Sequence, residues 1–278
     1  MKFRTIILCI LLVFSLSACG ITQPAQTTAA DTTASPDSTT VPDTTAAEIT
    51  VPDSPDLPTA PTGRTVTSLP EEYTLDDLVF PYWEETLEWS DGYNNNTFTA
   101  VIPGIYPFSG DAIRCEAEIA AIMIPYVEAE MEYMSLGASA TMNFVDYAAY
   151  LNDHILSIII RQETLYDLTY YHVFNLDLTT GKQLLPADMK ALLNISDADI
   201  SAAISDAFLS KYGSKDSFAN PELSEAYQEQ YDRSIAQKNI DLAQIYLGEN
   251  GEAFIAANVY SLAGADYYPQ LLPLNETE

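Results

Sequence analysis

The sequence predicts an α+β fold that follows a signal peptide and a disordered stalk. Aromatic residues are concentrated beyond residue 64, where all 18 tyrosines, both tryptophans and eight of the ten phenylalanines lie. Short apolar runs separated by Gly, Pro, Asn and Asp indicate antiparallel strands, and a few longer stretches have apolar residues at helical spacing. We therefore expect one or more antiparallel sheets packed by two to three helices.

Residues 1–18 have the pattern of a bacterial lipoprotein signal peptide. Two basic residues come first, residues 6–14 are apolar, and residues 16–18 (Leu-Ser-Ala) lie directly before Cys19. The apolar run is shorter than the about 20 residues that a membrane-spanning helix needs. The alternative is an ordinary secretory signal with an incidental cysteine. We expect lipid on Cys19 and an extracytoplasmic chain anchored to the outer face of the cytoplasmic membrane.

Residues 19–64 are predicted to be a lipidated cysteine followed by a disordered stalk. Thr, Ala, Pro, Asp and Ser dominate this segment, and it contains no aromatic residue. Such a composition cannot bury enough apolar surface to fold. Fully extended, the 45 residues after Cys19 reach roughly 150 Å, which suits holding a domain away from the membrane.

The mature chain is strongly acidic. From Cys19 onward it has 9 basic and 40 acidic residues, a net charge of −31, and residues 65–278 have 8 basic and 34 acidic residues, a net charge of −26. This charge repels nucleic acid, so we predict no nucleic-acid partner, and it attracts basic proteins at short range. Solubility through self-repulsion is the plainer explanation of the same charge.

Cys115 is the single cysteine after the lipidation position, because Cys9 belongs to the signal peptide. One thiol cannot form an internal disulfide, so the core must supply the stability of the domain. Cys115 lies in an apolar helical stretch, and we expect a buried, unreactive thiol.

Residues 65–140 are predicted to form an N-terminal α/β subdomain. Two strands, residues 82–89 and 97–102, surround a turn-rich segment. A helix is expected over residues 111–123, with Asp111 as its N-cap. Pro125 should end or kink this helix, although the residues after it could continue it.

Residues 141–278 are predicted to form a C-terminal α+β subdomain packed on the first one. It begins with three antiparallel strands, at residues 141–151, 155–162 and 170–178. The run Leu-Ser-Ile-Ile-Ile at residues 156–160 is typical of a buried central strand.

Two helices come next. The segment Ser-Asp-Ala-Asp at residues 196–199 resembles a capping box and opens a helix that ends at Gly213. Asn220 and Pro221 open the second helix. Asp197 and Asp199 fit helix capping better than a calcium loop, with a weak surface calcium site as the alternative.

A hairpin and an edge segment close the chain. Asn250 and Gly251 form a turn between predicted strands at residues 242–247 and 253–260. Residues 267–274 are predicted to lie at a sheet edge, because their two prolines cannot donate to a central ladder.

No catalytic or metal-binding motif stands out. Cys-x-x-Cys, His-Glu-x-x-His, Gly-x-Ser-x-Gly and glycine-rich phosphate loops are missing. His154 is expected in a solvated turn and His172 packed within a strand. Glu84, Glu85 and Glu88 could be imagined as a glycosidase pair, but coincidence among 40 acids explains them. We predict no catalytic residue, no metal and no cofactor, with a hydrolase as the least favoured alternative.

Aromatic side chains are the candidates for partner contact. Trp83 and Trp89 are six residues apart on a predicted strand, so they share one face, and core packing is the plainer explanation of them. Three tyrosines cluster near a predicted loop, where anchors of a protein interface also occur. The candidate partner-binding residues are Tyr166, Tyr170, Tyr171, His172, Trp83 and Trp89.

Four stretches occur in an order that resembles a known family. They are residues 98–107 (Phe-Thr-Ala-Val-Ile-Pro-Gly-Ile-Tyr-Pro), 155–160, 174–182 (Phe-Asn-Leu-Asp-Leu-Thr-Thr-Gly-Lys), and 245–252 leading to 263–268. The family is the extracytoplasmic domain shared by lysozyme-sensing anti-sigma factors and by the non-catalytic N-terminal module of membrane-bound peptidoglycan deacetylases. The resemblance covers most of residues 95–274.

Two departures from this family concern the loop next to the third stretch. The family often has a Gly-Gly-Ala-His segment there, whereas residues 166–172 contain no glycine and only His172 matches. The acidic-Leu-Phe that often follows the turn is Ala-Asp-Met at residues 187–189. These changes concern the ligand preference of the loop.

The expected function is that of a non-enzymatic, membrane-anchored surface lipoprotein that binds an extracellular partner. The resemblance implies a muramidase of the lysozyme type, bound as a decoy, inhibitor or sensor. Because lysozymes are generally basic, a domain with a net charge of −26 would steer them toward itself. The alternative partner is peptidoglycan or another glycan that binds to aromatic faces.

Overall fold

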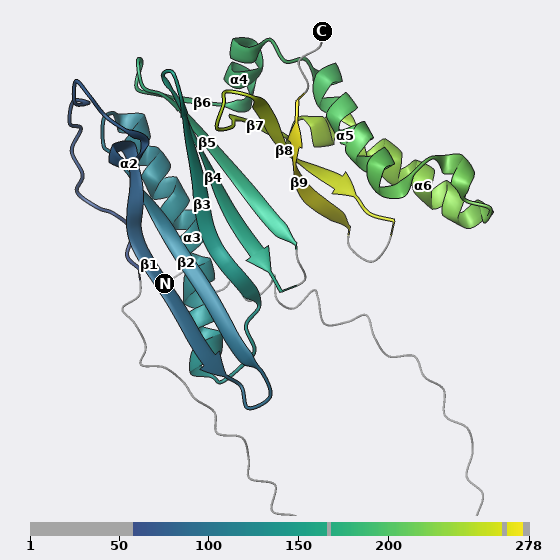
Figure 1. Ribbon diagram of the computed structural model, residues 1–278, viewed down its shortest axis with the longest axis horizontal. Coiled ribbons are helices and arrows are strands. Elements are labelled where there is room, and N and C mark those ends of the chain that lie inside the picture. Colours follow the sequence, from purple (N-terminus) through teal and green to yellow (C-terminus); the bar gives the residue numbers. More distant parts are fainter. Residues whose placement is uncertain (1–57, 166–167, 263–265, 275–278) are drawn as a thin grey trace, which may run out of the picture. The chain divides into compact units, whose positions relative to one another are not determined.

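A computed structural model describes residues 58–165, 168–262 and 266–274 (Figure 1). These residues belong to one compact unit, Ala46–Glu278. They form a mixed six-stranded sheet and an antiparallel three-stranded sheet with several helices, so the predicted α+β class is confirmed. The predicted signal peptide, Cys19 and the stalk up to residue 57 lie outside the described residues.

The larger sheet has the strand order β1-β2-β3-β4-β5-β6. All neighbours are antiparallel except β2 and β3, which run parallel and pair at Thr99–Phe144 and Ala100–Val145. A parallel pair needs a long crossover connection, and helix α3 supplies it. The strands are β1 (Val79–Ser90), β2 (Asn95–Ile105), β3 (Met142–Asn152), β4 (Ile155–Thr164), β5 (Thr169–Asp177) and β6 (Lys182–Leu184).

Helix α3 (Gly110–Ser135) packs on one face of this sheet. A short helix, α2 (Leu75–Leu78), precedes β1 in the chain. The N-cap of α3 is Ser109, whose hydroxyl accepts a hydrogen bond from the backbone of Ala112, so the prediction of Asp111 as N-cap is wrong. Asp111 lies in the first helical turn and instead accepts a hydrogen bond from the backbone N–H of Gln183 at 2.9 Å.

The helix continues through Pro125, so the predicted end near residue 123 is wrong, whereas the alternative that the residues after Pro125 continue the helix is confirmed. A proline inside a helix costs about 3 kcal/mol, because it removes one backbone hydrogen bond and crowds the preceding turn. Buried apolar side chains on both sides of Pro125, at Met123 and Val127, hold the helix on the sheet and offset this cost.

The three-stranded sheet has the order β7 (Gln244–Leu247), β8 (Ala253–Tyr260), β9 (Tyr267–Pro273), which confirms the predicted hairpin and the edge position of the last strand. Helices α5 (Asp197–Tyr212) and α6 (Pro221–Ser234) pack on it through Phe208 and Tyr227. Ser196 and Asn220 are their N-caps, as predicted. Helices α4 (Pro186–Leu193) and α7 (Gln237–Ile240) were not predicted.

The hydrophobic core consists of two clusters. One joins α3 to strands β1–β5, and the other joins α4–α7 to β7–β9 and includes Ile155 from β4. The predicted subdomain boundary near residue 140 lies just before β3, so the predicted N-terminal and C-terminal subdomains both contribute strands to the larger sheet.

Buried hydrogen bonds join the two sheets along the outer edge of β7. The backbone N–H of Leu247 donates to Ser157 Oγ at 3.2 Å, and Ser157 Oγ donates to Asn175 Oδ1 at 2.7 Å. Asn175 Nδ2 then donates to the carbonyl of Ile245 at 2.8 Å. These two side chains satisfy backbone groups of an edge strand that no neighbouring strand covers.

The segment before α2 is fastened to the end of β2. The guanidinium of Arg64 donates to the carbonyl of Ile105 at 3.2 Å and pairs with the buried carboxylate of Glu116 at 2.9 Å. The backbone N–H of Thr67 donates to the carbonyl of Pro107 at 2.9 Å. Together these contacts fix the path of the chain where it enters the fold.

Within residues 58–165, 168–262 and 266–274, no helix combines the length and apolar character that a membrane span requires.

Candidate functional site

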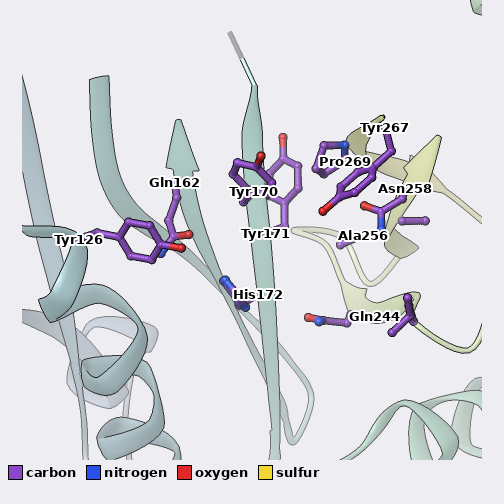
Figure 2. A pocket seen from close by; sticks show the side chains of 12 residues that line it. Tyr126, Gln162, Tyr170, Tyr171, His172, Gln244, Ala256, Asn258, Tyr267 and Pro269 are labelled. Carbon is purple, nitrogen blue, oxygen red and sulfur yellow. The ribbon is translucent and has the colours of Figure 1, made fainter. Parts of the chain in front are cut away.

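A cleft of about 280 Å³ lies beside β5, with α3 on one side and the three-stranded sheet on the other (Figure 2). Four tyrosines line it, and we call it the tyrosine cleft: Tyr126 from α3, Tyr170 and Tyr171 from β5, and Tyr267 from β9. Its polar side chains are the amides of Gln162, Gln244 and Asn258 and the imidazole of His172. Aromatic walls with a few polar groups are the usual lining of a small-ligand site.

The cleft exists because β6 is short. Strand β6 pairs only with Asn175–Asp177, so the first half of β5 has no strand on its outer side. The side chain of Gln244 takes the place of a strand there, because its Oε1 accepts a hydrogen bond from the backbone N–H of Val173 at 2.6 Å. The edge of β5 is therefore held next to the second sheet by a side chain.

A second pocket of about 290 Å³ adjoins the tyrosine cleft and shares Tyr126 and Tyr170 with it. Glu130 lies at its wall and is only 1% exposed. The Glu130 carboxylate accepts hydrogen bonds from the backbone and the hydroxyl of Thr141. Burial raises the pKa of Glu130, and these hydrogen bonds act in the opposite direction. We infer a structural role for Glu130 at the start of β3.

The tyrosine cleft carries no formal charge. None of the twelve described residues that line it is Asp, Glu, Lys or Arg. Burial lowers the pKa of His172, which favours the neutral imidazole. Burial, with Tyr267 and Tyr126 nearby, raises the pKa of Tyr170 and keeps its phenol protonated. An uncharged cleft contrasts with the net charge of −26 over residues 65–278.

Gln162 has an unusual environment at the inner side of the cleft. Its side chain points from β4 toward Tyr126 (Figure 2), and the residue is only 1% exposed. Its Nε2 is buried and has no hydrogen-bond partner among the described residues. A buried donor without a partner costs about 1–3 kcal/mol. This amide is therefore a group that a bound ligand could satisfy.

The structure brings together three of the six candidate partner-binding residues. Tyr170, Tyr171 and His172 are consecutive on β5 and all line the tyrosine cleft. Tyr166 lies outside the described residues, as does Cys19. The alternation of a strand places Tyr171 on the face opposite to its two neighbours, so the cleft wraps around the edge of β5.

The two tryptophans do not join this site. Trp83 and Trp89 face the hydrophobic core, and neither lines the cleft. Trp89 is 3% exposed and its indole N–H donates to the carbonyl of Ala138 at 2.8 Å. Core packing is confirmed for Trp89, whose ring is covered, so its predicted role in partner contact needs correction. Trp83 is half-buried, packs against the same core and lies outside the cleft.

The other titratable candidates have ordinary structural roles. His154 lies in the turn before β4 and is hydrogen-bonded to Asp153, as expected for a turn residue. Cys115 is fully buried, and burial raises its pKa to about 12. Asp199 caps α5 through Ser196, and Asp197 pairs with Lys190 at 2.7 Å. Among the described residues, no group of His, Cys, Asp or Glu is arranged to hold a metal ion.

Five polar or aromatic residues of the cleft were missed by the sequence reasoning: Tyr126, Gln162, Gln244, Asn258 and Tyr267. They come from α3, β4, β7, β8 and β9 and meet only in the folded chain. Only Tyr267 had a local signal in the sequence, because it and the next residue, Tyr268, form an aromatic pair at the start of the predicted edge segment.

A scan against protein-family models finds no match for this chain, and no curated protein matches it either. The resemblance to the lysozyme-sensing domain family therefore stays a prediction.

Proposed function

We propose that this chain is a non-enzymatic, membrane-anchored surface lipoprotein that binds an extracellular partner at the tyrosine cleft. The observation that carries this proposal is the concave, uncharged lining of four tyrosines and three amides within an acidic domain. Tyrosine supplies large contact areas at low cost in side-chain entropy, and it is frequent among residues that dominate binding energy.

The proposed partner is a basic extracellular protein, with a muramidase of the lysozyme type as the leading candidate. The net charge of −26 over residues 65–278 accelerates the encounter with a basic protein. The tyrosines then supply apolar contact area that salt does not screen. In this proposal, charge sets the rate of association and the cleft sets the rate of dissociation.

A peptidoglycan glycan strand is the second candidate, and the absence of charge from the cleft lining favours it. Sugars present hydroxyl groups to amides and apolar C–H faces to aromatic rings. A hydrolase is the least favoured candidate, because no carboxylate lines the described cleft to act as acid, base or nucleophile.

Titration calorimetry of residues 46–278, the unit that holds both hydrophobic clusters, tests the leading proposal. Lysozyme should bind one to one, with an affinity that falls between low and moderate salt but remains measurable. An unrelated acidic protein of similar charge should lose its binding to lysozyme at moderate salt.

Two tyrosine variants locate the contact. Tyr171→Ala removes a ring of the cleft and should weaken lysozyme binding about tenfold or more. Tyr93→Ala is the matched control, since Tyr93 is 97% exposed in the turn between β1 and β2. Equal affinities of the two variants for lysozyme would place the interface elsewhere. If lysozyme binds this protein and the acidic control protein equally, and moderate salt abolishes both interactions, the attraction is due to charge alone.

A further inference from the structure

We propose that the tyrosine cleft is a binding site for an uncharged sugar that bears an N-acetyl group, with the acetamido carbonyl bound by the side-chain amide of Gln162. This inference rests on the proposed function, because it takes the cleft as the ligand site. It goes further in naming the chemical class of the ligand and the residue that selects it.

The lining excludes charged ligands first. The described lining contains no Lys or Arg to pair with an anion and no Asp or Glu to pair with a cation, so a small charged ligand would lose its hydration there without an ion partner. His172 cannot replace them, because burial favours its neutral form. A neutral, polar ligand is left.

The arrangement of the lining then specifies what kind of neutral ligand fits. Tyr126 lies on the α3 side of β5 and Tyr267 on the side of the three-stranded sheet, with Tyr170 on β5 between them and Asn258 of β8 next to Tyr267 (Figure 2). Flat apolar rings beside planar amides suit a sugar, whose C–H faces are apolar and whose rim carries hydroxyl groups. A purely apolar ligand would leave the Nε2 of Gln162 without a partner.

Gln162 adds the selective contact. Its Nε2 is buried without a described partner, at a cost that a carbonyl acceptor would remove. The side chain of Gln162 lies next to the ring of Tyr126 (Figure 2), so a flat acetamido group can place its oxygen at Gln162 and its methyl group against a tyrosine ring. A plain hexose offers hydroxyl oxygens as acceptors, but it has neither the planar carbonyl nor the methyl group that would pack against the ring.

The direct test compares two neutral trisaccharides with residues 46–278: the β-1,4-linked trimer of N-acetylglucosamine and the β-1,4-linked trimer of glucose. Calorimetry should show binding of the acetylated trimer that is about three- to tenfold tighter, the ratio expected for one net hydrogen bond. In nitrogen–proton NMR spectra, the side-chain amide signals of Gln162 should shift with the acetylated trimer and stay in place with the glucose trimer.

Gln162→Leu should lower the affinity for the acetylated trimer about three- to tenfold and leave that for the glucose trimer unchanged. Gln237→Leu is the matched control, since Gln237 is exposed on α7 and lies outside the cleft. If Gln162→Leu does not fold, the NMR signals of the unaltered protein decide the question.

Equal affinities for the two trimers, or Gln162 amide signals that do not move at saturation, would overturn the acetamido contact. Binding of lysozyme at the cleft without binding of either trimer would overturn the sugar inference and leave the proposed function standing. Failure of both titrations would overturn both.

Discussion

The two faces of the six-stranded sheet are covered in different ways. Helix α3 packs on one face through apolar side chains, among them Ile158 and Met123. On the other face, Ser157 accepts a hydrogen bond from the edge of β7 and Asn175 donates one to it. Apolar contacts stabilise the fold but are not directional, whereas the hydrogen bonds have a defined geometry and therefore fix the position of β7. The position of the tyrosine cleft follows from the polar contact, because β7 contributes one of its walls.

The largest expected loss of stability comes from a substitution on the face of the sheet that α3 covers. Ile158→Ala removes a fully buried side chain between the sheet and α3 and should lower the free energy of unfolding by about 2–5 kcal/mol. Ile158→Val, which removes one methylene group, should cost about 0.5–1.5 kcal/mol. Urea denaturation measures both variants, and a loss below 1 kcal/mol for the alanine variant would show that the apolar face is not the main source of stability.

A smaller effect is expected for the polar contact. Asn175→Ala leaves the carbonyl of Ile245 without its side-chain donor and the O–H of Ser157 without its acceptor, while Ser157 Oγ still accepts from Leu247, and it should cost about 1–3 kcal/mol. It should also weaken ligand binding at the tyrosine cleft, which Ile158→Val should leave intact. A double-mutant cycle with Ser157→Ala measures the coupling, and additive effects would contradict a joint role for the two side chains.

The smallest expected effect concerns Glu130, a polar group within the apolar contact. Because burial raises its folded-state pKa, the folded protein binds this proton more tightly than the unfolded chain. Its contribution is therefore fully present below the unfolded pKa, near pH 4, and is lost as the pH rises through the folded pKa. Glu130→Gln keeps an acceptor for Thr141 and lacks this titration.

Urea denaturation at several values between about pH 4 and 7 measures the difference between Glu130→Gln and the unaltered protein. The variant should gain in relative stability as the pH rises. A relative stability that stays constant over this range would show that Glu130 titrates normally in the fold.

The strands and the long helices could be predicted because their local signals agree with the fold. The hairpin at Asn250–Gly251 and the capped helix after Ser196 are examples in which turn and cap chemistry indicate the right boundaries. Pro125 shows where such local rules fail. The proline opposes the helix, and the buried side chains on both sides of it outweigh that preference.

The candidate site was only partly predictable for a different reason. Tyr170, Tyr171 and His172 could be found because they are neighbours in the chain. Tyr126 and Tyr267 reach the same cleft only through the crossover helix and the second sheet. The unpartnered amide of Gln162 is a property of the packed structure, and an alternating strand pattern does not distinguish it from an ordinary buried residue.

The fastening of Arg64 and Thr67 to the end of β2 has a mechanical consequence. Tension that reaches the fold from the preceding chain is delivered to Ile105 and Pro107, between β2 and α3, before it reaches α2 and the edge strand β1. Three contacts share this load: the hydrogen bond of Arg64 to Ile105, the hydrogen bond of Thr67 to Pro107, and the ion pair of Arg64 with the buried carboxylate of Glu116. The edge strand is thereby spared a peeling force, and the sheet that forms one side of the cleft keeps its shape while the domain is pulled.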